Sequence, residues 1–380
     1  MMAKATQATP RSTQLGVIGT GLAVEKLHWP ALQQMPDRFQ IVAFADHTRA
    51  QGERFAAYSG ASLDDYYGDY HDLLRRDDVE AVLISLPIPL SLPVTRACLQ
   101  AGKHVICEKP PGANLEQGQE FLALAEQYPD RKLLVAENFF YRDDLRLARS
   151  LLDDGAIGRV NVMAWRLAFH FVPREGSFSS TPWRQQPQYR GGPHLDGGVH
   201  YIAQIRLLCG DVERLHGDVQ HANPTMGGPS DLILNVRFVS GAIGSYSAVH
   251  SPIPVPPGGN EMRLYGSEAV MTIGRRRIEI YRPDRSVEAH HVEGGDGGYY
   301  NEFRNFYDAV VHDEPIVGTV AQSFHNMLLV LRALDSAEGA QAATIDSAPG
   351  GLAASSIPLW RPRGASGLFD GLPVEIRRET

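Results

Sequence analysis

The sequence has few cysteines and no long apolar run. Its 380 residues include only three cysteines, an odd number with no Cys-x-x-Cys pair. This pattern argues against a disulfide-stabilised scaffold and a cysteine-based zinc site, and it favours a reducing compartment. No uninterrupted apolar stretch approaches the length of a membrane span, and the first residues lack the apolar core of a secretory signal. We therefore expect a cytoplasmic protein without a membrane-spanning segment.

The sequence also has no excess of positive charge. Its 36 Lys and Arg residues against 44 Asp and Glu residues give a formal net charge of −8. We therefore expect neither nucleic acid nor an anionic membrane as the main partner. The spacing of a metal site such as His-Glu-x-x-His and the nucleophile elbow Gly-x-Ser-x-Gly are both missing. We expect no metal ion and no serine-hydrolase chemistry.

From Gln14 onwards, short apolar segments alternate with helix-like segments. We expect strands at residues 15–19, 39–46, 80–87, 104–109 and 132–138. We expect helices at roughly residues 24–35, 48–59, 70–76, 92–101 and 115–127. Apolar strands separated by helices are typical of a parallel sheet covered on both faces, with right-handed connections. This half therefore predicts a Rossmann-type, doubly wound α/β domain.

After about Asn138 the expected strands are longer and alternate between apolar and polar residues, as in DLILNVRFV. Such strands are typical of an antiparallel sheet with one wetter face. We therefore expect a C-terminal α+β domain with a large, mostly antiparallel sheet. The Pro- and Gly-rich loop at 172–194 is typical of a binding loop. The predicted division is a disordered leader (1–13), a dinucleotide-binding domain (14–138), a substrate-binding domain (139–365) and a C-terminal tail (366–380).

The first expected strand leads into a glycine turn, Gly19-Thr20-Gly21-Leu22-Ala23, in which Val24 replaces the third glycine of a G-x-G-x-x-G motif. A strand, a glycine turn and a helix together predict a dinucleotide site, with the pyrophosphate at the helix N-terminus. The second strand ends in Asp46, near the expected spacing of about 20 residues for an acid that binds the ribose hydroxyls. Asp46 would repel the 2′-phosphate of NADP, so we predict NAD. His47 leaves NADP open, and an ordinary loop aspartate is the alternative for Asp46.

Two further segments contain charged or titratable residues at positions that would suit substrate binding or catalysis. Glu108 and Lys109 end the fourth expected strand, where open α/β sheets bind ligands. Lys109 could bind a substrate hydroxyl and stabilise its charge, or the two residues could be an exposed loop pair. Asp196 and His200 lie four residues apart in GGPHLDGGVH, which would place a carboxylate beside an imidazole on one helix face. A neutral His200 could then accept the hydroxyl proton; the alternatives are a helix N-cap for Asp196 and a packed or solvent-facing His200.

These segments together resemble the glucose-fructose oxidoreductase/inositol dehydrogenase/rhizopine-catabolism (Gfo/Idh/MocA) family. The resemblance is carried by GVIGTG, by AGKHVICEKP after ISLP, and by LDGGVH, and it spans roughly residues 14–340. It implies that Lys109 contacts both the nicotinamide ribose and a substrate hydroxyl, that Asp196 binds substrate and that His200 is the acid/base. It also implies a homodimer or homotetramer formed through the open sheet of the second domain, and a Lys-Pro bond that is often cis.

The chain departs from that family pattern at two places. Pro87-Ile88-Pro89-Leu90-Ser91 replaces the usual Asn-x-x-His, and an aromatic pair lies within residues 137–142, so the pocket walls are more apolar than usual. The residues predicted to contact the cofactor are Gly19, Thr20, Gly21, Leu22, Ala23, Asp46, His47, Leu86, Pro87, Glu108, Lys109 and Asn138. The residues predicted to contact the substrate are Lys109, Tyr141, Trp183, Arg184, Asp196 and His200. Trp183 and Arg184 could form a lid over a sugar, or could be a structural Trp beside a surface Arg.

The sequence thus predicts an NAD(P)-dependent oxidoreductase that transfers a hydride between nicotinamide and a carbinol carbon of a sugar, sugar derivative or cyclitol. Lys109, Asp196 and His200 are its predicted catalytic residues. One alternative is a redox-neutral enzyme of the same fold, an epimerase or a glycosidase. A second is a non-catalytic NAD(P)-binding regulator, which would have no need of the three catalytic residues. A third is reduction of a non-sugar carbonyl or imine, which the apolar walls would suit.

Overall fold

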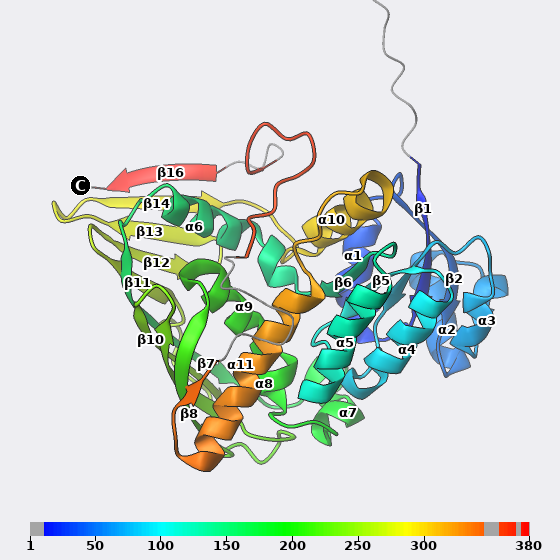
Figure 1. The fold of residues 1–380 in the computed structure, drawn as a ribbon, viewed down its shortest axis with the longest axis horizontal. Helices are drawn as coiled ribbons and strands as arrows, with labels where there is room; N and C mark the ends of the chain where they lie inside the picture. Colours follow the sequence, from blue (N-terminus) through cyan, green and yellow to red (C-terminus); the bar gives the residue numbers. More distant parts are fainter. Residues whose placement is uncertain (1–10, 346–356, 370–373, 380) are drawn as a thin grey trace, which may run out of the picture.

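Six parallel strands form the first of two sheets in the computed structural model, which describes residues 11–345, 357–369 and 374–379. The strands are β1 (Thr13–Ile18), β2 (Phe39–Ala45), β3 (Tyr66–Tyr67), β4 (Ala81–Ile84), β5 (His104–Glu108) and β6 (Leu133–Ala136). Their order is β3-β2-β1-β4-β5-β6 (Figure 1). The order reverses between β1 and β4, and doubly wound sheets bind ligands outside the carboxyl ends of the strands at this point.

Helices cover both faces of this sheet, which is why a strand such as β4 is buried at every residue. The helices are η1 (Val24–His28), α1 (Trp29–Leu32), α2 (Arg49–Ser59), α3 (Tyr70–Leu74), α4 (Ile88–Gln100) and α5 (Leu115–Gln127), with the short turn η2 (Leu63–Asp65). One face packs against α3, α4 and α5, and the other packs against η1, α1 and α2. Helix α4 begins earlier than the expected residue 92, because Pro89 lies in its first turn, where a missing amide hydrogen is tolerated.

Ten strands form the second sheet, in the order β15-β8-β9-β10-β7-β11-β12-β13-β14-β16. Their bounds are β7 (Val160–His170), β8 (Val212–Gln220), β9 (Asp231–Phe238), β10 (Ile243–Ser251), β11 (Met262–Gly266), β12 (Val270–Gly274), β13 (Arg277–Tyr281), β14 (Val287–Val292), β15 (Ala343–Thr344) and β16 (Val374–Glu379). Neighbouring strands pair antiparallel except β7 and β10, which are parallel. The predicted fold class, a Rossmann-type sheet followed by an α+β half, is confirmed.

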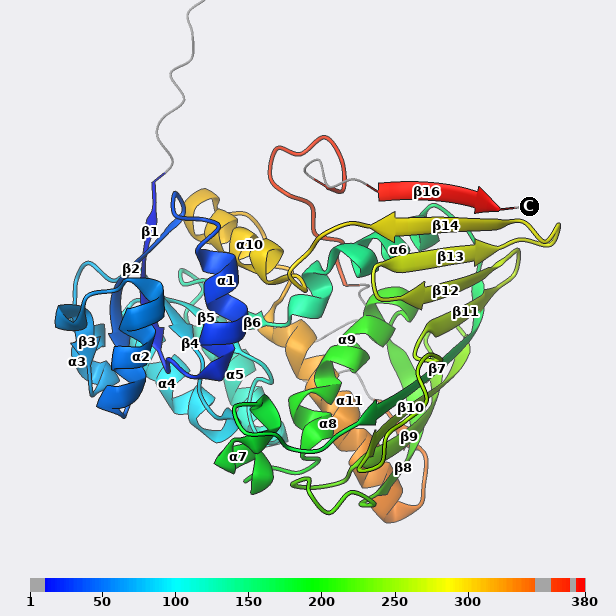
Figure 2. The same cartoon turned by 180° about the vertical axis from the view of Figure 1, so that it is seen from behind.

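Helices α6 (Asp143–Asp153), α9 (Gly198–Cys209) and α11 (Val320–Gly339) pack on one face of the second sheet. Figures 1 and 2 show α9 and α11 lying between the two sheets. Because these helices bury one face of the sheet, buried residues alternate with exposed ones along β9. The shorter segments are η3 (Asn138–Tyr141), η4 (Phe178–Ser180), α7 (Pro182–Gln185) and α8 (Pro193–Asp196).

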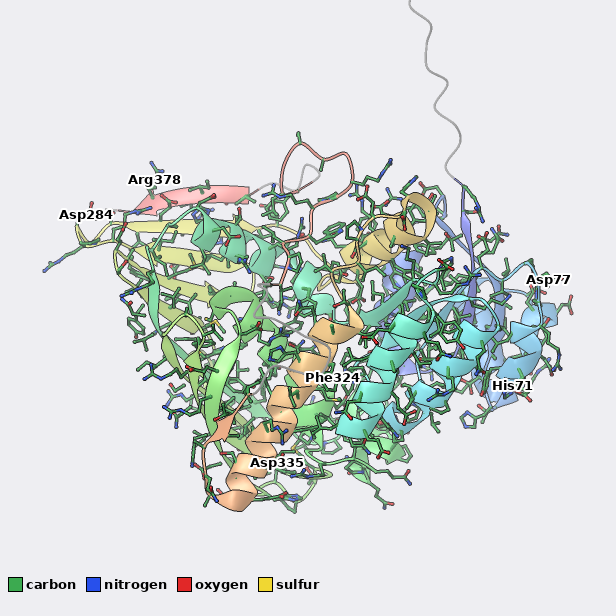
Figure 3. The ribbon with its side chains drawn as sticks, viewed as in Figure 1. His71, Asp77, Asp284, Phe324, Asp335 and Arg378 are labelled. Atoms are coloured by element: carbon green, nitrogen blue, oxygen red, sulfur yellow. The ribbon has the colours of Figure 1, made fainter. Side chains whose placement is uncertain are left out.

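The two halves meet in a close helix–helix contact. A Cβ atom on Gly118 of α5 would lie 2.3 Å from Cε of Met327 and 2.5 Å from the ring of Phe324, both on α11. Phe324, labelled on α11 in Figure 3, is fully buried. A residue at position 118 must therefore lack a side chain for the two helices to approach this closely.

Helix α10 (Tyr299–His312) follows strand β14 of the second sheet in the chain but packs on the first sheet. Its Phe303, Phe306 and Tyr307 share a core with Leu15 and Val17 of β1. Strand β16 lies within the expected C-terminal tail and pairs with β14. The predicted domain limits stay predictions, and residues 1–10 of the expected leader lie outside the described residues. No helix in the described parts of the chain is long and apolar enough to cross a membrane.

Candidate active site

A cleft of about 640 Å³ lies at the carboxyl ends of the strands of the first sheet. Most of the predicted site residues line it, although they come from distant parts of the sequence. These lining residues are Gly19, Gly21, Leu22, Ala23, Asp46, His47, Leu86, Pro87, Glu108, Lys109, Asn138, Trp183, Arg184, Asp196 and His200. The sequence prediction thus named residues that the fold brings to one place.

The glycine turn has the geometry that a dinucleotide requires. Gly19 has a φ of +84°, and a Cβ atom there would lie 2.3 Å from the carbonyl oxygen of Ser85. A Cβ atom on Gly21 would have no neighbour within 4 Å, so the backbone at Gly21 borders open space into which a pyrophosphate fits. Val24, which replaces the third glycine, is buried in the core beneath the turn.

Asp46 is fixed at the end of β2 by the turn itself. The backbone N–H and the hydroxyl of Thr20 donate to its Oδ2 at 2.9 and 3.0 Å, and the N–H of Thr48 donates to Oδ1 at 3.2 Å. Thr20 therefore positions Asp46 rather than lining the cleft. The His47 side chain is 90 % exposed, with Nδ1 at 3.1 Å from Oδ1 of Asp46. A carboxylate held in this way fits the hydroxyls of an NAD ribose.

Lys109 and Asp196 join the two halves of the protein at the base of the cleft. The Lys109 ammonium donates to Oδ1 of Asp196 and to its backbone oxygen, both at 2.8 Å. Arg184 Nε donates to Oδ2 of Asp196 at 2.6 Å. Burial opposes ionisation of this carboxyl, but the two cations outweigh burial and hold its pKa well below the ordinary value. Gly197, not Asp196, is the N-cap of α9, so the carboxylate binds cations instead of capping a helix.

The carboxylate beside His200 is that of Glu137, not that of Asp196. Nδ1 of His200 lies 2.5 Å from Oε1 of Glu137, whose side chain is almost fully buried at the end of β6. The ring of Phe139 stacks on His200 with a centroid distance of 4.8 Å and an interplanar angle of 15°. Glu137 was absent from the predicted site residues. Its place at the carboxyl end of a parallel strand, the signal that identified Glu108, could have found it.

Comparison with known proteins places the chain in a family. Residues 13–136 match the family described as "Oxidoreductase family, NAD-binding Rossmann fold", and residues 145–272 match the "GFO/IDH/MocA C-terminal domain". The chain belongs to the Gfo/Idh/MocA oxidoreductase family. The resemblance read from the sequence is thereby confirmed.

Relatives of this Gfo/Idh/MocA protein support the assignment. The protein is 30% identical over 305 residues to a dTDP-3,4-didehydro-2,6-dideoxy-alpha-D-glucose 3-reductase of Streptomyces violaceoruber. The aligned part covers 74% of this chain and 80% of the reductase. The crystal structure of an oxidoreductase from Thermotoga maritima shares 29% identity and a TM-score of 0.81, covering 88% of this chain and 98% of that one. The WlbA dehydrogenase from Bordetella pertussis, solved with NADH and UDP-GlcNAcA, shares the fold, with 18% identity, a TM-score of 0.76, and coverage of 88% and 99%.

A second histidine–carboxylate pair includes Glu108, which lines the cleft of this Gfo/Idh/MocA protein. Nε2 of the fully buried His28 lies 2.7 Å from Oε1 of Glu108. Burial opposes ionisation of Glu108, but its hydrogen bond with His28 and the charge of Lys109 lower its pKa. His28 was not predicted, because nothing in the sequence shows that η1 brings it to the end of β5. The Lys109–Pro110 peptide bond is cis.

Two predicted residues that follow β6, Asn138 and Tyr141, differ in their relation to the cleft. Asn138 lines the cleft, with Nδ2 donating to the backbone oxygen of Gly297 at 2.7 Å, while its buried Oδ1 has no hydrogen-bond partner. Such an unpaired acceptor fits a bound donor. Tyr141 is fully buried away from the cleft, and its hydroxyl donates to Oδ1 of Asn305 at 2.8 Å. The structure does not bring Tyr141 to the site.

Proposed function

We propose that this protein is an NAD-dependent dehydrogenase or reductase acting on a CH–OH group of a sugar, sugar derivative or cyclitol. One observation carries the proposal. Lys109, Asp196 and His200 lie in the same cleft as the glycine turn and Asp46, so a coenzyme held by the turn would meet the substrate beside these three residues. The named activities of the sugar-modifying relatives agree with this chemistry.

His200 is the proposed acid/base. Its Nδ1 faces the Glu137 carboxylate at 2.5 Å, and a carboxylate accepts the proton of Nδ1–H. This interaction leaves Nε2 unprotonated and able to accept the substrate hydroxyl proton. When bound, NAD+ would accept the hydride in alcohol oxidation, and NADH would supply it in carbonyl reduction.

Lys109 is the proposed positioning group for the reacting hydroxyl. An ammonium has three N–H donors, and Asp196 accepts from Lys109 through two oxygens. The third donor can bind the substrate oxygen and stabilise the charge that develops on it. Asp196 in turn holds both Lys109 and Arg184 in place, and Arg184 lies against the ring of Trp183 at 4.0 Å from its centroid.

We further propose a cytoplasmic homodimer or homotetramer that binds no nucleic acid. Val162, Ile233 and Ile243 are exposed by 36%, 53% and 47% on the second sheet, and Figures 1 and 2 show no described helix over that face. Exposed apolar patches of this kind are typical of protein interfaces. Light scattering should give a mass of at least twice the 41.8 kDa chain, and Ile233→Glu with Ile243→Glu should reduce it to one chain.

The activity is tested by following NADH absorbance with a panel of aldoses, polyols and cyclitols. We expect at least one substrate for the unmodified protein, and a loss of kcat of about 100-fold or more in His200→Ala and in Lys109→Ala. Near-normal turnover in both variants would exclude the assigned roles. Conversion of a substrate without net NADH change would instead identify the redox-neutral alternative.

A further inference from the structure

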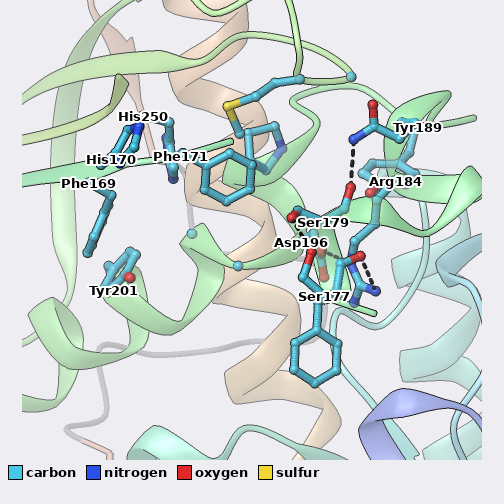
Figure 4. Close-up of a pocket in the computed structure, with 17 residues that line it drawn as sticks. Phe169, His170, Phe171, Ser177, Ser179, Arg184, Tyr189, Asp196, Tyr201 and His250 are labelled. Carbon is cyan, nitrogen blue, oxygen red and sulfur yellow. Dashed lines mark hydrogen bonds and ion pairs between the residues drawn. The ribbon is translucent and has the colours of Figure 1, made fainter. Parts of the chain in front are cut away.

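A second pocket of about 460 Å³ opens beside Asp196 (Figure 4). It shares Phe178, Arg184, Asp196 and Gly197 with the cleft that contains the glycine turn. A substrate whose hydroxyl reaches Lys109 would therefore direct its remaining atoms into this second pocket. The volume lies within the range of about 300–1,000 Å³ that is typical of small-molecule sites.

One side of this pocket is aromatic and apolar. Phe169 and Tyr201 stack at a centroid distance of 6.1 Å, and the ring of His250 lies 5.6 Å from that of Phe169 and 5.4 Å from that of Phe171. The Nδ1 atom of His250 is held by the Ser230 backbone oxygen at 2.7 Å. Burial lowers the pKa of His250, so its ring is uncharged at neutral pH. Figure 4 shows these rings on one side of the pocket.

The opposite side is polar, and several of its groups already have partners. The Ser177 hydroxyl donates to the Arg174 backbone oxygen at 2.5 Å and lies 2.9 Å from the Ser179 hydroxyl. Gln185 Nε2 donates to the backbone oxygen of Ser179 at 2.6 Å. Arg184 is the one Lys or Arg side chain among the described residues that line this pocket, and its Nε already donates to Asp196 at 2.6 Å.

This distribution of charges and hydrogen-bonding groups restricts the kinds of ligand that can bind in the pocket. A sugar diphosphate needs several cations for its phosphates, and Arg184, which is already paired with Asp196, is the single cationic side chain among the described residues lining this pocket. A second sugar would bury hydroxyls against Phe169, Phe171 and Met226, whose side chains offer them no strong hydrogen-bond partner, and unpaired buried hydroxyls are costly. A flat apolar group would contact the aromatic wall without either cost.

We propose that this pocket binds an uncharged aryl group carried by the substrate, so that the enzyme prefers aryl glycosides to free sugars and to sugar diphosphates. The proposal rests on the proposed function, because it places the reacting hydroxyl at Lys109. It names the substrate class, which the reaction type alone leaves open.

The experiment compares matched ligands by titrating the protein–NADH complex and measuring Kd. The ligands are the methyl and phenyl glycosides of several pentoses and hexoses, with a uridine-diphosphate sugar as a third class. We expect at least one phenyl glycoside to bind about tenfold or more tightly than its methyl partner. Phe171→Ser should reduce that ratio to within about threefold and leave methyl glycoside binding unchanged, whereas Phe171→Trp should retain the ratio.

Val172→Ser is the matched control, because Val172 is the next residue, is 41% exposed and does not line the pocket. Equal binding of every phenyl and methyl pair, no measurable binding of any phenyl glycoside, or tighter binding of the sugar diphosphate would overturn the proposal. Because binding is measured without turnover, these outcomes are separate from failure of the proposed function, which would appear as no NADH change with any sugar or cyclitol.

Discussion

Nδ1 of His200 lies 2.5 Å from Oε1 of Glu137, a residue 63 positions earlier in the chain. The pair spans the two halves of the protein, because Glu137 follows the last strand of the first sheet and His200 lies on α9. The position of the imidazole is therefore fixed only once the halves have docked. Four predictions follow from this pair and from other buried charges.

Glu137→Gln should lower kcat by about 100-fold with little change in Kd for NADH. The glutamine amide can donate to Nδ1, and the imidazole would then carry its proton on Nε2, which is the wrong tautomer for a base. Steady-state kinetics across pH and a separate NADH titration check this prediction. Glu53→Gln, on the exposed surface of α2, should leave both quantities unchanged. A Glu137→Gln enzyme with normal kcat at every pH would show that the pair has no catalytic role.

Asp196→Asn should destabilise the protein by about 3 kcal/mol at neutral pH, because Lys109 and Arg184 would lose their buried counter-charge. The lowered pKa of Asp196 means that its contribution is present above the ordinary carboxyl pKa near 4 and is lost as pH falls below it. Urea unfolding at pH 7 and pH 3.5 should thus show a smaller difference between the two proteins at the lower pH. A difference that grows on acidification would contradict the pairing.

Glu302→Gln should stabilise the protein increasingly as pH rises. Glu302 is fully buried, and neither carboxyl oxygen has a hydrogen-bond partner. Burial, with the charges of Glu108 and Glu137, raises its pKa well above the ordinary value. The unfolded chain ionises above about pH 4.5 while the folded protein keeps the proton, so Glu302 costs about 1 kcal/mol per pH unit in that range.

Urea unfolding at pH 5 and pH 8 measures this effect. The free energy of unfolding of the Gln variant should exceed that of the unmodified protein by more at pH 8 than at pH 5. The surface variant Glu53→Gln provides the baseline, because its side chain is 55% exposed. An equal gain at both pH values would mean that Glu302 is ionised in the folded protein.

Asp46→Ser should shift coenzyme use towards NADP. The aspartate carboxylate would repel a 2′-phosphate, and serine removes that charge while it retains a hydroxyl. We expect the ratio of kcat/KM for NADP to that for NAD to rise about tenfold or more. His47→Ala tests whether the exposed imidazole contributes, and it should change the ratio by less than about threefold. An unchanged ratio in Asp46→Ser would place the ribose elsewhere.

Local signals in the sequence predicted much of the fold and part of the site. Continuous apolar strands indicated the parallel sheet, and the ends of those strands identified Asp46 and Lys109, because parallel strands bring their carboxyl ends to one edge. Strand β3 was missed because two residues carry no detectable pattern. The expected neighbour of His200 was Asp196 at helical spacing, but the chain turns between α8 and α9 and Glu137 takes that place.

Contacts between distant segments could not be predicted from local pattern. The pairing of His28 with Glu108 depends on how η1 packs on the first sheet, and that of Arg184 with Asp196 depends on how α7 lies relative to α8. Tyr141 was expected in the pocket because it follows the β6 strand end. The polypeptide turns through η3 and buries the ring against Trp360 instead.

Because α10 packs on the first sheet, the core of that sheet can be completed only after α10 has been synthesised. The core around Leu15 and Val17 includes Phe303 and Phe306, which leave the ribosome only after nearly the whole second sheet has been made. Part of this apolar face of the nascent dinucleotide-binding half therefore stays uncovered until α10 has been synthesised. Such a face is a site where chaperones bind and where premature aggregation begins.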